Sequence, residues 1–277
     1  MTDKEYGYHT RIWYEEPESD NPFAARAAYC HGYDVYGAIL PKASWAEYIF
    51  TLFKGERPEA GQAHLLEKLA IAIANPGPRE LSVRAAMNGG AAGSPHAASL
   101  MSALAVGSGQ YGGGHEVYLC MRLWQTCGMD LARWNSLLRQ PPQSEQADIW
   151  PAMEHAPGFD PNGESTPMPV RQTLEYLAGV KGDGALAWLR DNHQALTETL
   201  GYPLAMSGVA AAAFVDLGMD EHQAAMLYLL LRLPGAAAHA LEQRALGWKT
   251  FPFYGDAIEL ENDPGPKNNV DLSGVNL

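Results

Sequence analysis

Hydrophobic and polar positions along most of the chain recur with a helical period. The stretch Ser44-Trp45-Ala46-Glu47 is typical of a helix N-terminus, because the serine can cap the first turn while the glutamate reaches back to it. Four apolar residues then fall on one helical face, at Trp45, Ile49, Leu52 and Phe53. Gly55 and Pro58 follow them, so we expect the helix to end there.

Similar patterns predict further helices at residues 65–74, 94–105, 117–137, 169–180, 184–199, 207–217, 220–232 and 235–246. Strict alternation of apolar and polar residues, which marks a half-buried strand, is absent. We therefore expect an all-α protein with ten or more helices. Many of these segments are rich in alanine and glycine, as in "GVAAAAFVDLG", so the helices should pack closely.

Loops are predicted at residues 140–146 and 155–168. The second, "HAPGFDPNGESTPM", is long and rich in proline, glycine and aspartate. A loop of this length within a compact domain is more often functional than a mere connection.

Composition narrows the classes of function. The 277 residues are 47% hydrophobic and 18% charged, as in ordinary globular proteins, and the net charge of −13 argues against nucleic acid and anionic membrane surfaces as partners. The polar, acidic start does not resemble a secretory signal, and the apolar run 202–215 is too short to span a bilayer. We expect a cytoplasmic protein. Its three cysteines, Cys30, Cys120 and Cys127, are expected to be buried thiols.

The glycine-rich stretch 107–116, "GSGQYGGGHE", does not fit a phosphate-binding loop, because no strand is predicted before it. His115 and Glu116 are adjacent, so they point to different sides of a helix and would not bind one metal ion as a pair. The other histidines show no HxxxH or HxH spacing, and no metal site is expected.

Two residues of the apolar stretch "LYLLLRLPGAAAHALEQ" stand out. Arg232 needs a partner, because an unpaired charge is costly to bury. That partner is either a structural acidic side chain or the carboxylate of a ligand, which an arginine can bind with two hydrogen bonds. His239 can share a helical face with Glu242, where a surface hydrogen bond is the simpler interpretation.

Five stretches, in order, resemble motifs of one family. They are "HGYDVYGAILPKASWAEYIFTLFKGERP" (31–58), "LSVRAAMNGGAAGSPHAASLMSALAVGSGQYGGGHE" (81–116), "APGFDPNGESTPMPVR" (156–171), "GYPLAMSGVAAAAFVDLGM" (201–219) and "LRLPGAAAHALEQ" (231–243). Together they are similar to the citrate synthase superfamily, and most to its short citryl-CoA-lyase-type members. The order and spacing agree over about residues 25–255.

The resemblance implies an all-α fold with a large and a small lobe around a cleft, in a homodimer. In these terms residues 1–24 form an N-terminal arm, 25–115 and 221–277 the large domain, and 116–220 the small domain. The small-residue helices over 82–105 would suit packing across a two-fold axis. The family makes or breaks a C–C bond next to an acyl-CoA thioester.

Most of the family's catalytic residues are replaced here. The histidine that polarises the thioester carbonyl corresponds to Tyr111, and the second catalytic histidine falls at Asp160-Pro161. The catalytic aspartate corresponds to Ser207, and a substrate-binding histidine to Pro76. The arginine that holds substrate carboxylates is retained as Arg232.

The resemblance therefore suggests a diverged lyase or related enzyme. Tyr111 would donate a hydrogen bond to an oxyanion, His115 or Asp160 would carry the proton, and Ser207 would occupy the third catalytic position. Arg232 and His239 would bind the substrate. A coenzyme A thioester would be a substrate, with no tightly bound cofactor, and would contact Pro157, Gly158, Phe159 and Arg171.

Two alternatives stay open. The loss of the usual catalytic residues is what a non-catalytic ligand-binding protein or partner subunit of the same fold would show, since fold alone does not fix function. The weak basic character around residues 157–171 also admits a β-dicarbonyl hydrolase or lyase that does not use coenzyme A.

Overall fold

Helices make up most of the computed structural model, which describes residues 10–139 and 155–252. The predicted all-α class is confirmed. The helices within the described residues are α1 (Trp45–Lys54), α2 (Ala60–Ile73), α3 (Leu81–Ala91), α4 (His96–Gly107), α5 (Gly114–Cys127), α6 (Leu131–Leu138), α7 (Met168–Lys181), α8 (Ala185–Leu200), α9 (Met206–Asp216) and α10 (Glu221–Leu246).

Helix α1 begins and ends where its sequence predicts. The Ser44 hydroxyl accepts a hydrogen bond from the Glu47 amide at 3.2 Å, and the Ser44 amide donates to the Glu47 carboxylate at 2.6 Å. Gly55 then takes the left-handed conformation with φ 78°. The expected apolar face is partly wrong, because Trp45 is 60% exposed and Phe50 is the residue buried in the core.

Two predicted helix boundaries are corrected. The segment 117–137 is two helices, α5 and α6, because Gly128 turns the chain between them with φ 54°. The segments 220–232 and 235–246 are one helix, α10, with Pro234 inside it. The amide next to the proline, at Gly235, donates to the Ala74 carbonyl at the end of α2 at 2.8 Å, so it has a partner outside its own helix.

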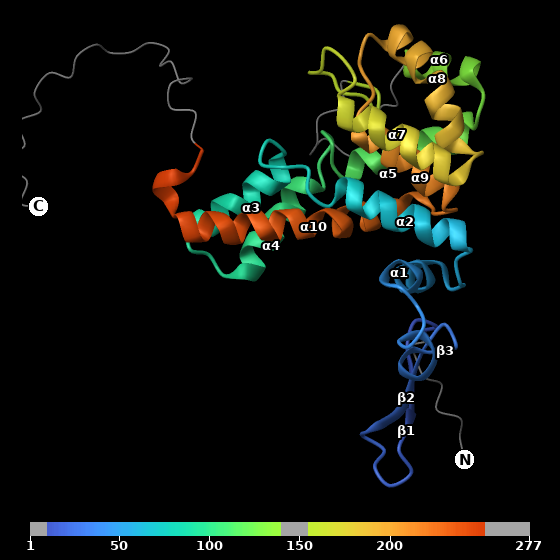
Figure 1. The fold of residues 1–277 in the computed structure, drawn as a ribbon, viewed down its shortest axis with the longest axis vertical. Coiled ribbons are helices and arrows are strands. Elements are labelled where there is room, and N and C mark those ends of the chain that lie inside the picture. Colours follow the sequence, from blue (N-terminus) through green and yellow to red (C-terminus); the bar gives the residue numbers. More distant parts are fainter. Residues whose placement is uncertain (1–9, 140–154, 253–277) are drawn as a thin grey trace, which may run out of the picture.

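A small antiparallel sheet near the N-terminus was not predicted. Its strands β1 (Tyr14–Pro17), β2 (Ala25–Cys30) and β3 (Tyr33–Asp34) pair in that order, and the short π-helix η1 (Val35–Ile39) follows. β1 is exposed or half-exposed throughout, so it lacks the apolar alternation that reveals a strand in sequence. Figure 1 shows the sheet extending away from the helices beyond α1.

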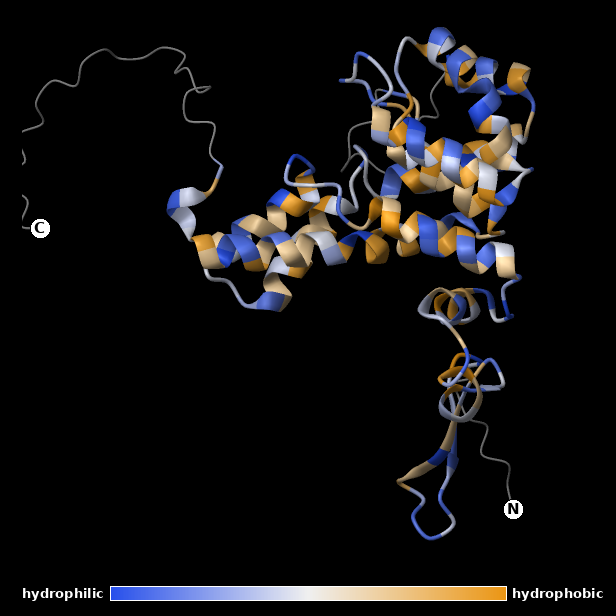
Figure 2. Ribbon diagram, in the orientation of Figure 1, coloured by the Kyte–Doolittle hydropathy of each residue, from blue (hydrophilic) through white to orange (hydrophobic). Residues whose placement is uncertain are grey.

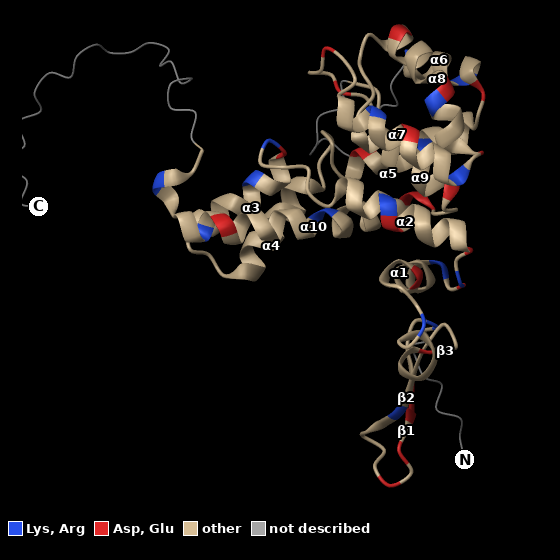
Figure 3. Cartoon of the chain, in the orientation of Figure 1, with Lys and Arg blue, Asp and Glu red and all other residues tan. Residues whose placement is uncertain are grey.

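Two hydrophobic clusters hold the helices together. The larger one surrounds α9, whose residues 207–214 are all buried, and draws on α2, α5, α7 and α8. The smaller one joins α3, α4 and the second half of α10. Small residues allow that contact, because a Cβ added to Gly90 would lie 2.1 Å from the Ala240 carbonyl oxygen. Figure 2 shows apolar residues spread along both groups of helices, and Figure 3 shows few charges on α3, α4 and α9.

The predicted division into an N-terminal arm, a large domain and a small domain stays a prediction. Residues 1–9 of the arm, residues 253–277 of the large domain and the predicted loop 140–146 lie outside the described residues. Among the described helices, α10 is long and apolar enough to cross a membrane by length and composition. It nevertheless packs against α3, α4 and α5 and contains the buried Arg232.

Candidate active site

A cleft of about 270 Å³ lies between the glycine-rich turn before α5, the loop 155–167 and the start of α9. Its polar lining comes from Tyr111, Glu116, His155, Asp160 and Asn162. Its apolar lining comes from Phe159, Pro161, Pro167, Val170, Leu204 and Met206. The cleft is large enough for a small organic molecule and presents both titratable and apolar groups to it.

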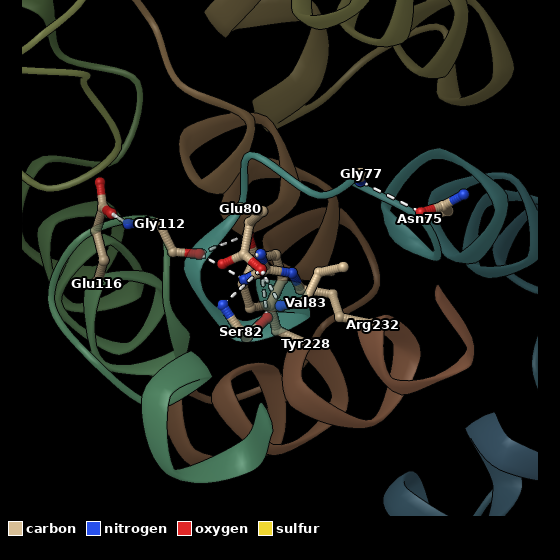
Figure 4. A network of polar contacts seen from close by, with 9 residues as sticks. All are labelled: Asn75, Gly77, Glu80, Ser82, Val83, Gly112, Glu116, Tyr228 and Arg232. Carbon is tan, nitrogen blue, oxygen red and sulfur yellow. Dashed lines mark hydrogen bonds and ion pairs between the residues drawn. The ribbon is translucent and has the colours of Figure 1, made fainter. Parts of the chain in front are cut away.

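Hydrogen bonds to the backbone of Gly112 hold the glycine-rich turn in place. Gly112 has a φ of 66°, which favours glycine, and its amide donates to the Glu116 carboxylate. Its carbonyl accepts from the Tyr228 hydroxyl at 3.0 Å and from Arg232 Nη1 at 2.6 Å. Figure 4 shows Gly112 between Glu116 on one side and Arg232 with Tyr228 on the other. The glycines thus serve a backbone turn that places Tyr111 at the cleft.

The Glu116 carboxylate is buried at the base of the cleft, with 1% of the residue exposed. It accepts hydrogen bonds from the Gly158 amide at 2.8 Å, from the Ser207 hydroxyl at 3.1 Å and from the Gly112 amide. These three donors offset the cost of burying the carboxylate. They also tie the turn, the loop and α9 to one side chain of α5.

His155 lies beside that carboxylate and is 2% exposed. Its Nε2 is 3.7 Å from Glu116 Oε1, and the Tyr111 ring stacks on the imidazole with centroids 5.2 Å apart and planes at 18°. Within the described residues, neither ring nitrogen has a hydrogen-bond partner. A buried imidazole in this state is unusual, because buried polar groups are normally hydrogen-bonded.

Cys120 is buried on the same helix as Glu116. Burial, together with the nearby Glu116 carboxylate, raises the pKa of the Cys120 thiol. The thiol therefore stays protonated at neutral pH and is a poor nucleophile. All three cysteines are buried and free of disulfides, as predicted.

Arg232 has an acidic partner within the chain. Its Nη2 is 2.7 Å from Glu80 Oε1, and its guanidinium lies 4.8 Å from the centre of the Tyr228 ring. The other oxygen of Glu80 accepts from the amides of Ser82 and Val83 at the start of α3. Burial raises the pKa of Tyr228 to about 12, although Arg232 opposes that rise. Of the two interpretations of Arg232, this geometry corresponds to the structural ion pair.

The predicted catalytic residues are only partly brought together. Tyr111 and Asp160 line the cleft, and the Asp160 carboxylate accepts from the Asn162 amide at 2.9 Å. Ser207 lies behind the lining, where its hydroxyl donates to Glu116. His115 is not among the lining residues and stacks on Tyr118 with ring centroids 6.0 Å apart. Burial lowers the pKa of His115.

The predicted binding residues lie around the cleft and beyond it. Pro157, Gly158 and Phe159 are buried in the loop, where the Gly158 carbonyl accepts from the Ala205 amide at 2.9 Å. Arg171 is exposed in the first turn of α7. His239 Nε2 is 3.0 Å from the Asn75 amide oxygen, and its Nδ1 is 3.6 Å from Glu242.

Glu116 and His155 were not among the residues selected from the sequence. Glu116 belongs to the selected stretch 107–116, and His155 opens the loop that was expected to be functional. The two side chains lie close together although they are 39 positions apart in the chain, and no local sequence spacing predicts such a contact. Among the residues that the structure describes, no group of three or more histidine, cysteine or acidic side chains could hold a metal ion.

The comparisons with known proteins concern the fold. No family model matches the sequence, and no curated protein matches it. The solved structure of citryl-CoA lyase from Hydrogenobacter thermophilus is similar over 97% of this chain and 99% of its own, with a TM-score of 0.69 and 16% identity.

Two further solved structures share the fold. ATP citrate lyase from Methanothrix soehngenii, in complex with citrate and coenzyme A, is similar over 88% of this chain and 40% of its own, with a TM-score of 0.67 and 17% identity. Citrate synthase from Thermoplasma acidophilum, in a complex with carboxymethyl coenzyme A and oxaloacetate, is similar over 73% and 53%, with a TM-score of 0.52 and 14% identity. The chain therefore shares its fold with these solved structures of citryl-CoA lyase, ATP citrate lyase and citrate synthase.

Proposed function

We propose that the chain is an enzyme of the citrate synthase-like fold that makes or breaks a C–C bond next to a carbonyl of a carboxylated or acyl-CoA substrate. One observation carries the proposal. Tyr111 and Asp160, which replace the expected catalytic histidines, line one cleft. The Ser207 hydroxyl donates a hydrogen bond to the Glu116 carboxylate at the base of that cleft. Convergence of titratable groups on a cavity is typical of an active site.

Each selected residue has a role in this proposal. The Tyr111 phenol donates a hydrogen bond to the oxyanion that develops on the substrate carbonyl, and Asp160 or His115 carries the proton. The resemblance assigns Arg232 and His239 to a substrate carboxylate, but neither residue lines the cleft, and Arg232 is paired with Glu80. The loop 157–159 and Arg171 bind a coenzyme A thioester, which is a substrate and no resident cofactor. The similar ATP citrate lyase and citrate synthase structures contain coenzyme A or its carboxymethyl derivative, which supports testing a coenzyme A thioester as a substrate.

The test incubates the protein with ¹³C-labelled acetyl-CoA, citrate, oxaloacetate and a β-diketone, and follows new or broken C–C bonds by NMR. We expect Tyr111→Phe and Asp160→Asn each to lower turnover of the active probe by about 10²–10³-fold. Tyr176→Phe and Asp183→Asn, at exposed positions on the surface, are the matched controls and keep the wild-type rate.

Two results contradict the proposal. If both cleft variants retain the full rate, Tyr111 and Asp160 are not catalytic. If every probe is inert with the wild-type protein although one of them binds, the chain is a ligand-binding protein without this activity.

A β-dicarbonyl lyase or hydrolase that does not use coenzyme A is the second candidate, and charge favours it. None of the described residues that line the cleft is a lysine or arginine, and the sequence from 140 to 154 contains neither. Arg232 is held by Glu80, and the space beside it is only about 10 Å³, which is less than a carboxylate needs. Uncharged carbonyl compounds suit such a cleft better than citrate or a coenzyme A phosphate.

Thermal-shift measurements separate the two candidates. The β-dicarbonyl candidate predicts that a neutral β-diketone stabilises the protein and that citrate and oxaloacetate do not. The first candidate predicts a shift with citrate or oxaloacetate that is lost in Arg232→Ala.

We also propose a homodimer in the cytoplasm. The apolar side chains exposed on α4 and α10, among them Met101, Val106 and Leu241, support a partner surface on this part of the molecule.

A further inference from the structure

We propose that His155 carries the proton in this cleft and that Glu116 is the residue that positions it. The inference rests on the proposed function, since it concerns how a carbonyl substrate would be activated in the same cleft. It replaces Asp160 and His115 in that role with a residue that no motif assigns.

His155 is buried at the cleft without a hydrogen-bond partner for its imidazole in the part of the chain that the structure describes. The residue is 98% removed from solvent, lines the cleft, and has no hydrogen-bond partner at either ring nitrogen within the described residues. Burial of a polar side chain without a partner costs free energy, and a purely structural role offers nothing that offsets this cost. A ligand in the cleft would supply the missing partner.

Glu116 and Tyr111 lie beside the His155 imidazole as its charged and aromatic neighbours. Glu116 Oε1 lies 3.7 Å from Nε2, which is close enough to stabilise an imidazolium, and catalytic hydrogen bonds commonly tighten when substrate binds. Three donors hold the Glu116 carboxylate in place, and the Tyr111 ring fixes the plane of the imidazole by stacking. The other titratable groups at the cleft are Asp160, which lines it, and the Cys120 thiol beside Glu116.

The alternative proton carriers are less well placed. His115 stacks on Tyr118 outside the lining, and the Asp160 carboxylate is engaged by the Asn162 amide. With Nε2 facing Glu116, Nδ1 of His155 is the nitrogen left to act on a ligand.

The step itself is a proton transfer that needs no further reactant. The imidazole nitrogen takes a proton from the carbon next to the substrate carbonyl, and the C–H electron pair becomes the C=C bond of an enolate. The carbonyl oxygen takes the negative charge and accepts a hydrogen bond from the Tyr111 phenol. The imidazolium, next to Glu116, returns a proton to the carbon in the reverse step.

Exchange of α-protons for deuterium measures this step without requiring C–C bond chemistry. Acetyl-CoA, oxaloacetate and 2,4-pentanedione are followed in D₂O by ¹H NMR, with the protein-free rate subtracted. We expect the wild-type protein to exchange at least one probe, and His155→Gln and His155→Asn each to slow that exchange about 10²–10⁴-fold. His193→Gln, at a half-buried histidine of α8, is the matched control and keeps the rate.

The outcomes separate the two proposals. If exchange persists in both His155 variants and is lost in Asp160→Asn or His115→Gln, the assignment of His155 is wrong while the proposed function stands. If the wild-type protein exchanges no probe and forms or breaks no C–C bond, the proposed function is wrong and this inference falls with it.

Glu116 is tested through the pH dependence of the exchange rate. In Glu116→Gln a neutral amide no longer stabilises the imidazolium, so the acid limb of the pH–rate profile moves to lower pH. Ser207→Ala removes one hydrogen-bond donor from the Glu116 carboxylate, so the carboxylate stabilises the imidazolium more strongly and the acid limb moves to higher pH. This second variant keeps the test usable if Glu116→Gln does not fold. A limb that stays in place in the folded variants would reduce Glu116 to a structural residue.

Discussion

The sequence shows that Arg232 needs a partner, but it does not show which group that partner is. An arginine among apolar residues requires a partner, and the sequence supports both an acidic side chain and a ligand carboxylate. The structure supplies Glu80, which lies 152 positions earlier in the chain and also caps α3. Tyr111 and Asp160 could be selected because they occupy motif positions. Glu116 and His155 could not, because their importance depends on burial and on each other.

The Glu80–Arg232 pair should contribute substantially to stability. We expect Glu80→Ala to lower the free energy of unfolding by about 2–4 kcal/mol, because it leaves a buried guanidinium without its carboxylate. Asp130→Ala is the matched control, since Asp130 caps α6 through amides two and three residues ahead, as Glu80 caps α3. Loss of that cap should cost only about 1 kcal/mol.

Urea unfolding of the two variants measures the difference. Equal losses in Glu80→Ala and Asp130→Ala would mean that Glu80 stabilises the protein only as a cap and that Arg232 does not depend on it.

At the scale of elements, α10 illustrates where sequence signals mislead. Pro234 predicts a break, because proline lacks an amide hydrogen and clashes with the preceding turn. The helix continues through it, and the amide of Gly235 bonds to the Ala74 carbonyl at the end of α2. The break was inferred from local chemistry, whereas the continuity depends on a segment about 160 positions away. The same reasoning explains β1, which pairs with β2 although its own sequence shows no strand pattern.

The contact at Gly235 gives a prediction for this element. A Cβ at Gly235 would lie 2.3 Å from the Ala74 carbonyl oxygen and 2.7 Å from Asn75 Cα, so Gly235→Ala should lower the free energy of unfolding by about 1–3 kcal/mol. Gly179→Ala, in α7 with nothing within 4 Å of the added carbon, should raise it by about 0.5–1 kcal/mol. Denaturant midpoints of the two helical variants test this, and a stabilising Gly235→Ala would contradict the close contact.

At the scale of the whole molecule, five ordered motifs were enough to predict the fold. The similarity to citryl-CoA lyase over 97% of the chain at 16% identity agrees with that order. Motif order is informative because each motif marks a turn or a close helix contact that the fold requires. The N-terminal sheet carries no such motif and was not predicted.

The predicted dimer also belongs to this scale. Helices α3, α4 and α10 extend to one side of the molecule in Figure 1, and Met101 on α4 is 62% exposed. Light scattering should give about twice the chain mass of 30.1 kDa at micromolar concentration. Met101→Glu should weaken the dimer at least about tenfold by placing a charge in an apolar contact. Met129→Glu, at a comparably exposed site after α5, is the control, and a monomeric wild-type protein would contradict the prediction.

If the proposals hold, a carbonyl compound binds and reacts in the cleft between the glycine-rich turn and the loop 155–167. A crystal structure of the protein with the probe that gives the largest thermal shift would show where that compound binds. We expect the probe in this cleft, with its carbonyl oxygen within hydrogen-bonding distance of the Tyr111 hydroxyl and its α-carbon beside the His155 imidazole. A probe bound elsewhere, or in the cleft with its carbonyl turned away from Tyr111 and His155, would contradict the proposals.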